Sequence, residues 1–439
     1  MSNYNLRRKT KNIVSYKKVI RRSSMKNNIK ASEKLLRRRW IVLLGGFLLS
    51  LMGGMSYAWG SFVLPLAENW GWTAAQANLP FTVMIIVFSL TMIPAGWLQD
   101  KYGPRKIAMV GSIMFLVGYS LAALMRFFPY PIWLTLAYGI GVGIACGLTY
   151  ATIAPTARKW FADRPGFAVS LAVMGFGLAA VIFAPLKKEM IAVWGVDGTL
   201  FALGIFITAV SFIGANLIKN PPSNWKAPEN VNSNFKVKDV IKVVEEVTPQ
   251  EFIRTPRFYM LWLALAAVIG GGLTAIGLLT AYGEIELQLA PAFAAFSVSF
   301  YSLANGMGRP AMGWMADRFG SIRVMIGVYI IQSSVFIAFP WVATNYLLLF
   351  ICSLLLGLGY ATTFALFPVV VAKISGTKHL GMNYGLVFSA FGLGAITSLI
   401  GSWLLDLTGS FTPAFLLAGF ATVFGLILLM ILYKKFVLR

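Results

Sequence analysis

The segment GWMADRFGSIR at residues 313–323 repeats the segment GWLQDKYGPRK at residues 96–106, and each follows an apolar run. The matched aspartates, Asp100 and Asp317, lie 317 − 100 = 217 residues apart. GLTYAT at 147–152 likewise recurs as GLGYAT at 357–362, and GFGLAA at 175–180 recurs as AFGLGA at 390–395. The offsets are 357 − 147 = 210 and 390 − 175 = 215 residues. Three matches at nearly one offset indicate that the chain consists of two homologous halves.

Composition indicates a membrane protein with many helical spans. The 439 residues are 58% hydrophobic and 12% charged, with a mean hydropathy of +0.73, whereas a soluble domain carries about 25% charged residues. The apolar runs have the length of transmembrane helices. The short alternating segments of a membrane β-barrel do not occur in the sequence.

Twelve spans can be counted, six on either side of a polar segment. We therefore predict an all-α membrane protein with twelve transmembrane helices in two pseudo-symmetric six-helix bundles. The spans are expected near residues 40–66, 78–98, 106–126, 131–157, 166–186, 195–218, 257–282, 291–315, 321–340, 344–372, 380–405 and 411–433. The predicted units are an N-terminal tail (1–39), a first bundle (40–218), a linker (219–256), a second bundle (257–433) and a C-terminal tail (434–439).

Basic residues mark one side of the membrane. Of the 38 Lys and Arg residues, 14 lie within the first 39 residues, and most others fall in loops expected on the same side. Loops on the opposite side hold only Arg126, Lys187 and Lys188, together with several acidic residues. This positive-inside pattern predicts a multi-pass plasma or inner membrane protein with both termini in the cytoplasm. A transit peptide is the alternative for residues 1–39, since it would also be basic and poor in acids.

Few residues are candidates for catalytic or metal chemistry. The chain has one histidine, His379, and two cysteines, Cys146 and Cys352, which lie in apolar spans. Helix packing explains these cysteines better than a disulfide or a metal cluster. We predict that the protein is not an enzyme and binds no metal or cofactor. The net charge of +23 is explained by the basic loops on one side of the membrane, so we also predict no nucleic-acid partner. The expected partners are the lipid bilayer and a small substrate, and a monomer is expected to suffice.

Arg309 is the charge expected nearest the membrane midplane. It lies 317 − 309 = 8 residues before Asp317, which is about 12 Å along a helix and near the centre of a bilayer core of about 30 Å. An arginine at this depth costs about 2.5–3.5 kcal/mol and normally faces a cavity or a partner. No Asp or Glu falls within a predicted span except Asp197, at the edge of the span near 195–218, so we infer that the partner is an anion from solution. A structural role, capping carbonyls of a broken helix, is the alternative.

The repeated loops are expected to form a cytoplasmic gate. Their glycines allow close helix approach and tight turns. Asp100 and Asp317 can accept hydrogen bonds from a neighbouring helix N-terminus or pair with a cation of the loop. Such bonds would hold the cytoplasmic helix ends together in one conformation of the protein and break in a second conformation. The alternative is that they only fix the shape of the loops. The candidate gate residues are Gly96, Asp100, Lys101, Gly103, Arg105, Gly313, Asp317, Arg318, Gly320 and Arg323.

The twin loops, the twelve spans and the duplicated halves resemble the major facilitator superfamily over roughly residues 38–435. The resemblance implies a substrate site at the midplane between the halves, worked by alternating access. A narrower resemblance, to the oxalate/formate antiporters and the related monocarboxylate transporters, rests on TPRFYMLW (255–262), GRPAMGWMADRFG (308–320), ALFP (365–368) and NYG (383–385). In those families the arginine matching Arg309 binds a substrate carboxylate. The same resemblance implies that aromatic residues line the cavity at Tyr57, Tyr150, Tyr360 and Phe364.

The sequence departs from these families at three positions. Phe391 stands where the oxalate carrier has a second buried cation, Ser56 where it has a glutamine, and Asn305 where animal monocarboxylate carriers have an aspartate. With one cation, a bound dianion keeps an uncompensated negative charge, whereas one guanidinium gripping one carboxylate is neutral. The single arginine therefore favours a monocarboxylate such as lactate, pyruvate, formate or acetate. Oxalate/formate-type exchange of a dicarboxylate is the alternative.

The remaining site residues each have a packing interpretation beside the functional one. Tyr150 and Tyr360 occupy equivalent repeat positions, and their hydroxyls could donate to a carboxylate. Asn305, one turn before Arg309, could orient the guanidinium or the substrate, and Phe391 is expected to shape an apolar wall.

Coupling and two competing functions stay open at the level of sequence. The substrate could move together with a proton or in exchange for a second carboxylate. A drug exporter of the same fold would need a buried acid, and a transporter-like sensor would need a sizeable signalling domain. The sequence offers neither.

Overall fold

The computed structural model describes residues 35–223, 225, 227–228 and 246–436. These residues are helical or irregular, with no β-strand among them. The residues outside this description are 1–34 of the predicted N-terminal tail, 224, 226 and 229–245 of the predicted linker, and 437–439 of the predicted C-terminal tail.

The N-terminal half begins with a helix over residues 35–54. The further elements of this half are η1 (Met55–Trp59), α2 (Gly60–Trp70), α3 (Ala74–Tyr102), α4 (Pro104–Ala123), η2 (Leu124–Arg126), α5 (Pro131–Leu134), η3 (Thr135–Ile140), α6 (Gly141–Tyr150), α7 (Ile153–Trp160) and α8 (Pro165–Leu217). Proline occupies the first turn of α4, α5 and α8, where its missing N–H has no helical partner to lose.

The C-terminal half follows the short helix α9 (Pro249–Phe252). Its elements are α10 (Pro256–Ile285), α11 (Pro291–Ala294), α12 (Phe296–Phe319), α13 (Ser321–Val342), α14 (Tyr346–Ser375), α15 (Leu380–Phe388), α16 (Ala390–Thr408) and α17 (Thr412–Phe436). The chain reverses direction at a glycine between α3 and α4 and again between α12 and α13: Gly103 has φ +87° and Gly320 has φ +92°. These left-handed backbone angles are readily adopted only by glycine.

The described helices provide twelve membrane crossings. Ten helices are long and apolar enough to span a bilayer. One of them, α8, has 53 residues and non-helical backbone at Gly195 (φ +69°, ψ −177°), so it crosses twice. The twelfth crossing is α12, which contains Asn305, Arg309 and Asp317 and is the most polar of the long helices. The predicted fold class is confirmed.

The sequence prediction was wrong about residues 187–194. They were expected to form a loop, but helical backbone continues from Pro165 as far as the break at Gly195. Lys187, which was assigned to that loop, is fully buried. Because the helix continues through it, its side chain is directed by helical geometry into the bundle.

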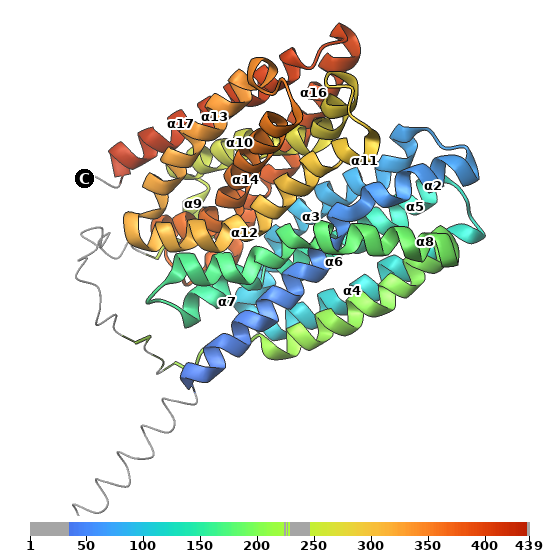
Figure 1. Cartoon of the computed structure of the whole chain (residues 1–439). Coiled ribbons are helices and arrows are strands. Elements are labelled where there is room, and N and C mark those ends of the chain that lie inside the picture. The colour runs from blue at the N-terminus through green and yellow to red at the C-terminus, as the bar shows by residue number, and fades with distance from the viewer. Residues whose placement is uncertain (1–34, 224, 226, 229–245, 437–439) are drawn as a thin grey trace, which may run out of the picture.

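The two halves lie side by side (Figure 1). Within the halves, α4 packs on α6 and α8, and α10 packs on α16 and α17. Between them, α3 packs on α15 and α16, and α8 packs on α12 and α14. The first described helix begins at the same end of the bundle where α17 ends (Figure 1). We call this the basic end; Asp100 and Asp317 lie there, at the last turns of α3 and α12.

Candidate functional site

The Arg309 side chain lies at the junction of the two halves and is fully buried. It belongs to α12, and its Nη1 donates to the backbone carbonyl of Val173 on α8, at 2.7 Å. Its Nε and Nη2 donate to Oδ1 of Asn305, at 3.3 and 3.1 Å. Among the described residues the ion pairs join Asp163 to Arg39 and Arg164, so no carboxylate neutralises Arg309. The site therefore contains a buried positive charge held by neutral oxygens.

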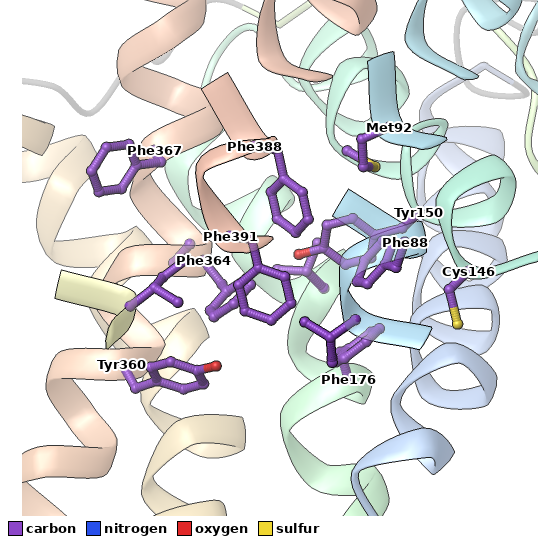
Figure 2. Close-up of a cluster of buried hydrophobic side chains, with 14 of the residues drawn as sticks. Phe88, Met92, Cys146, Tyr150, Phe176, Tyr360, Phe364, Phe367, Phe388 and Phe391 are labelled. Carbon is purple, nitrogen blue, oxygen red and sulfur yellow. The ribbon is translucent and has the colours of Figure 1, made fainter. Parts of the chain in front are cut away.

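An aromatic wall lies beside the guanidinium. The ring of Phe364, from α14, lies 4.9 Å from the Arg309 Cζ atom. Phe391, from α16, is fully buried and meets the rings of Phe364 and Phe88 at 5.8 and 6.1 Å. Since Phe88 belongs to α3, this wall joins both halves (Figure 2). Position 391 is thus filled by a packed apolar ring and supplies no charge.

Three predicted tyrosines lie within electrostatic range of Arg309: Tyr57, Tyr150 and Tyr360. The hydroxyls of Tyr150 and Tyr360 point toward the junction of the halves from opposite sides (Figure 2). All three hydroxyl oxygens are buried. Those of Tyr57 and Tyr360 face each other, and that of Tyr150 faces Tyr384 and Arg309, but none of these contacts has full hydrogen-bond geometry in the part of the chain that is described. A buried hydroxyl without a partner costs free energy, so these groups provide donors for a polar ligand.

Ser56 is not brought to this cluster by any described contact. Its hydroxyl lies 4.0 Å from the Cys146 sulfur, inside the N-terminal bundle. The next residue, Tyr57, instead packs edge-on against Phe176 at 4.9 Å. Ser56 and Tyr57 lie in η1, a 3₁₀ helix, in which adjacent side chains point about 120° apart, so only one of the two reaches the junction.

Sequence reasoning missed two tyrosines, Tyr301 and Tyr384, that are also within electrostatic range of Arg309. Tyr301 lies two turns before Arg309 on α12 and donates to the Gly272 carbonyl at 3.1 Å. Tyr384 stands inside the segment NYG that carries the family resemblance. Helical spacing from Arg309 could have found the first, and the motif could have found the second.

Lys187 is a second buried cation that the sequence did not reveal. Its Nζ donates to the Met55 carbonyl at 2.7 Å and lies 5.3 Å from the ring of Phe62. Met55 starts η1, where the first membrane helix is interrupted and Ala58 has non-helical angles (φ −87°, ψ 25°). Lys187 therefore binds at the break that carries Tyr57. It lies 187 − 173 = 14 residues beyond Val173 on α8, about 21 Å along a continuous helix, so it is not opposed to Arg309 across one ligand.

At the basic end, Asp100 and Asp317 each bind the start of a helix in the other half. Asp317 accepts from the backbone amides of Gly166 and Phe167 at 2.7 and 2.8 Å. Asp100 accepts from Gly381 and Met382 at 3.4 and 3.0 Å. The free amides and positive dipole of a helix N-terminus favour a carboxylate. The sequence allowed either a helix N-terminus or a cation of the loop as the partner of each aspartate. In the structure each aspartate accepts hydrogen bonds from a helix N-terminus.

Glycines let the halves approach closely at this end. A Cβ atom built on Gly313 would lie 2.4 Å from the carbonyl oxygen of Gly166, and one on Gly96 would lie 2.2 Å from that of Gly381. Both contacts are shorter than real Cβ atoms make. Small residues at such crossings are what close helix packing in a membrane requires.

The predicted gate cations contact their own half. Arg105 donates to Asn216, and Arg323 donates to the hydroxyl of Tyr433. Lys101 lies over the rings of Trp97 and Tyr102, and Arg318 over those of Trp314 and Phe319.

Comparison with known proteins agrees with this architecture. The family description "Major Facilitator Superfamily" matches residues 42–285 and 270–436. The oxalate:formate antiporter of Oxalobacter formigenes is 29% identical over 361 residues, covering 82% of this chain and 83% of the relative. Monocarboxylate transporter 12 of Rattus norvegicus is 24% identical over 423 residues, covering 89% and 84%.

A solved structure of the transporter FucP, in the outward conformation, has the same fold. It superposes with a TM-score of 0.65 at 18% identity and covers 89% of this chain and 98% of its own. The resemblance predicted from the sequence is confirmed, and the chain belongs to the Major Facilitator Superfamily.

Proposed function

We propose that the protein is a secondary active transporter of small monocarboxylates in which Arg309 binds the substrate carboxylate. The observation that carries this proposal is the fully buried guanidinium without a carboxylate partner among the described residues. A guanidinium has five N–H donors, and three atoms of Arg309 each donate one bond within the protein. Two donors are left for a substrate oxygen.

The charge of the site supports a monoanion. One carboxylate next to one guanidinium is neutral in a low-dielectric site, whereas a dianion leaves a charge unbalanced. Phe391 supplies no cation at the opposite wall, and the unpartnered hydroxyls of Tyr57, Tyr150 and Tyr360 can donate to the second carboxylate oxygen. Asn305 is proposed to orient the guanidinium, because it accepts from two of its nitrogens.

We propose that transport occurs by alternating access, with the substrate joining the two halves at the midplane and the bonds of Asp100 and Asp317 joining them at the basic end. A substrate bound to Arg309 of α12 and to Tyr150 of α6 would bridge both halves at the midplane. The bonds of Asp100 and Asp317 close the basic end, and they have to part before that end can open. We propose that the basic end faces the cytoplasm, in the plasma or inner membrane, because the loops there hold most of the basic residues.

Uptake of labelled lactate into proteoliposomes tests the central claim. Arg309→Ala should abolish uptake while the protein still inserts and purifies as a single species. Asn305→Ala is the matched variant, since it removes a neighbour of the guanidinium without removing the charge, and partial activity is expected. Unchanged uptake by Arg309→Ala would refute the assignment.

Exchange of oxalate for formate is the second candidate, favoured by the likeness to the antiporter of that name. A panel of competing mono- and dicarboxylates separates the two, because the main proposal expects lactate, pyruvate, formate or acetate to compete better than oxalate. The same vesicles distinguish the coupling schemes. Exchange requires a carboxylate inside the vesicle, whereas symport requires only a proton gradient. A drug exporter would show competition by organic cations, which a buried arginine disfavours.

A further inference from the structure

A cavity of about 510 Å³ lies at the basic end, away from the Arg309 site. It is formed where three parts of the chain meet: the end of α7, the segment that follows α8, and the loop between α14 and α15. Its lining residues are Arg158, Lys159, Ala162, Asn220, Pro221, Pro222, Ser223, Trp225 and Thr377.

The segment after α8 is fixed to α7 by tryptophans. Trp160 Nε1 donates to the Lys219 carbonyl at 2.5 Å, and Trp225 Nε1 donates to the Trp160 carbonyl at 3.3 Å. The two rings lie 5.2 Å apart. The cavity therefore has a built wall that joins the linker to the N-terminal half.

Polar atoms at this cavity are buried without a partner. Nε and Nη1 of Arg158 have no acceptor, and Oδ1 of Asn220 has no donor, within the described chain. Buried guanidinium nitrogens without acceptors are costly, and hydrogen bonds to a charged group are among the strongest in proteins. An oxyanion bound in this cavity would supply the acceptors that Nε and Nη1 of Arg158 lack.

The carboxylates around the cavity accept hydrogen bonds from backbone amides. Asp317 and Asp100 lie within electrostatic range of Arg158 and Lys159, but their oxygens accept from helix N-termini. Glu246 accepts from the backbone amides of Thr377 and Lys378, at 3.2 and 2.8 Å. Because none of these carboxylates accepts a hydrogen bond from Nε or Nη1 of Arg158, an oxyanion from outside the described chain can supply the missing acceptors.

We propose that this cavity is a regulatory site for an oxyanion of the phosphate class, held by Arg158 and Lys159, which stabilises the closed basic end. Arg158 and Lys159 belong to the N-terminal half, and Thr377 belongs to the C-terminal half. All three line one cavity only while the halves are together. A ligand that binds one state better than the other shifts the equilibrium toward that state. That the ligand comes from the cytoplasm rests on the orientation proposed above; the site itself does not rest on the substrate.

Thermal unfolding of the purified full-length protein in detergent tests the site without any transport assay. Inorganic phosphate should raise the unfolding temperature more than chloride does at equal ionic strength. Arg158→Gln should raise the phosphate concentration for half of this effect by about tenfold or more, because it removes charge-assisted bonds. Arg158→Lys keeps the positive charge but loses the paired N–H donors of the guanidinium. Its phosphate concentration for half of the effect should lie between those of the natural protein and Arg158→Gln. Lys434→Gln, an exposed change at the end of α17, is the control and should behave as the natural protein does.

The source of the anion is separated by repeating the measurement in nanodiscs with phosphatidylcholine alone or with added phosphatidylglycerol. Stabilisation by free phosphate in both identifies a soluble anion, and Arg158-dependent stabilisation only by phosphatidylglycerol identifies a lipid headgroup. The proposal is overturned if neither anion stabilises the protein, or if Arg158→Gln responds as Lys434→Gln does. In vesicles, phosphate on the basic side should slow transport; a substrate other than a carboxylate would leave the thermal result unchanged.

Discussion

Closure of the basic end depends on Gly313, and Gly313→Ala should open it. The added methyl group would lie 2.4 Å from the Gly166 carbonyl oxygen, whereas ordinary contact begins at 3.4 Å. Relief of this contact requires α12 and α8 to separate by about 3.4 − 2.4 = 1.0 Å. The bonds from Gly166 and Phe167 to Asp317, now 2.7 and 2.8 Å, would then lengthen beyond 3.5 Å. Two hydrogen bonds to a charged group contribute about 1.5–3 kcal/mol each. The closed arrangement should lose about 3 kcal/mol or more, which shifts its equilibrium by over a hundredfold.

The assay is the rate at which a membrane-impermeant maleimide labels a buried cysteine from the basic side. Thr156→Cys is a suitable reporter, because Thr156 is fully buried in α7 and α7 packs on α14 and α15 of the other half. Cys146 and Cys352 would be replaced by serine to remove background. Gly327→Ala is the matched control, since a Cβ atom there meets nothing within 4 Å. Equal labelling rates for Gly313→Ala and Gly327→Ala would refute the reasoning.

Three further predictions concern the buried charges. Arg309→Lys keeps the charge but loses the forked contact, so kcat/KM for the substrate should fall by about tenfold to a hundredfold, since one charge-assisted bond is lost; a change below twofold in the uptake assay would contradict the bidentate contact. Phe391→Lys places a cation against the aromatic wall and should shift the competition panel toward oxalate, while a panel unchanged from that of the natural protein would contradict the charge argument. Lys187→Glu sets a carboxylate against the Met55 carbonyl and should destabilise the protein by about 1–3 kcal/mol, measured as a lower unfolding temperature than that of Lys187→Met; the same temperature for both variants would contradict the expected cost of a buried carboxylate at this carbonyl.

The sequence determined the architecture because membrane insertion leaves few alternatives. Apolar runs of sufficient length have to become helices, since a bilayer offers no partner for backbone groups. The repeat around Asp100 and Asp317 then implied two similar halves. The isolation of Arg309 could also be seen in the sequence, because charges are rare within membrane spans and no acidic residue accompanies it in its run.

Tertiary structure alone decided what these charges touch. The distance of 2.7 Å between Arg309 and the carbonyl of Val173 joins segments 136 residues apart, and no local pattern encodes such a contact. The burial of Lys187 could not be predicted from the sequence either. A lysine among polar residues at the expected end of a span is normally assigned to a loop. Lys187 is buried because the helix continues to Gly195 and the interruption at Met55–Trp59 presents a carbonyl to it. Spans and repeats follow from local hydropathy and chain-wide similarity, whereas the partner of each buried charge depends on how twelve helices pack.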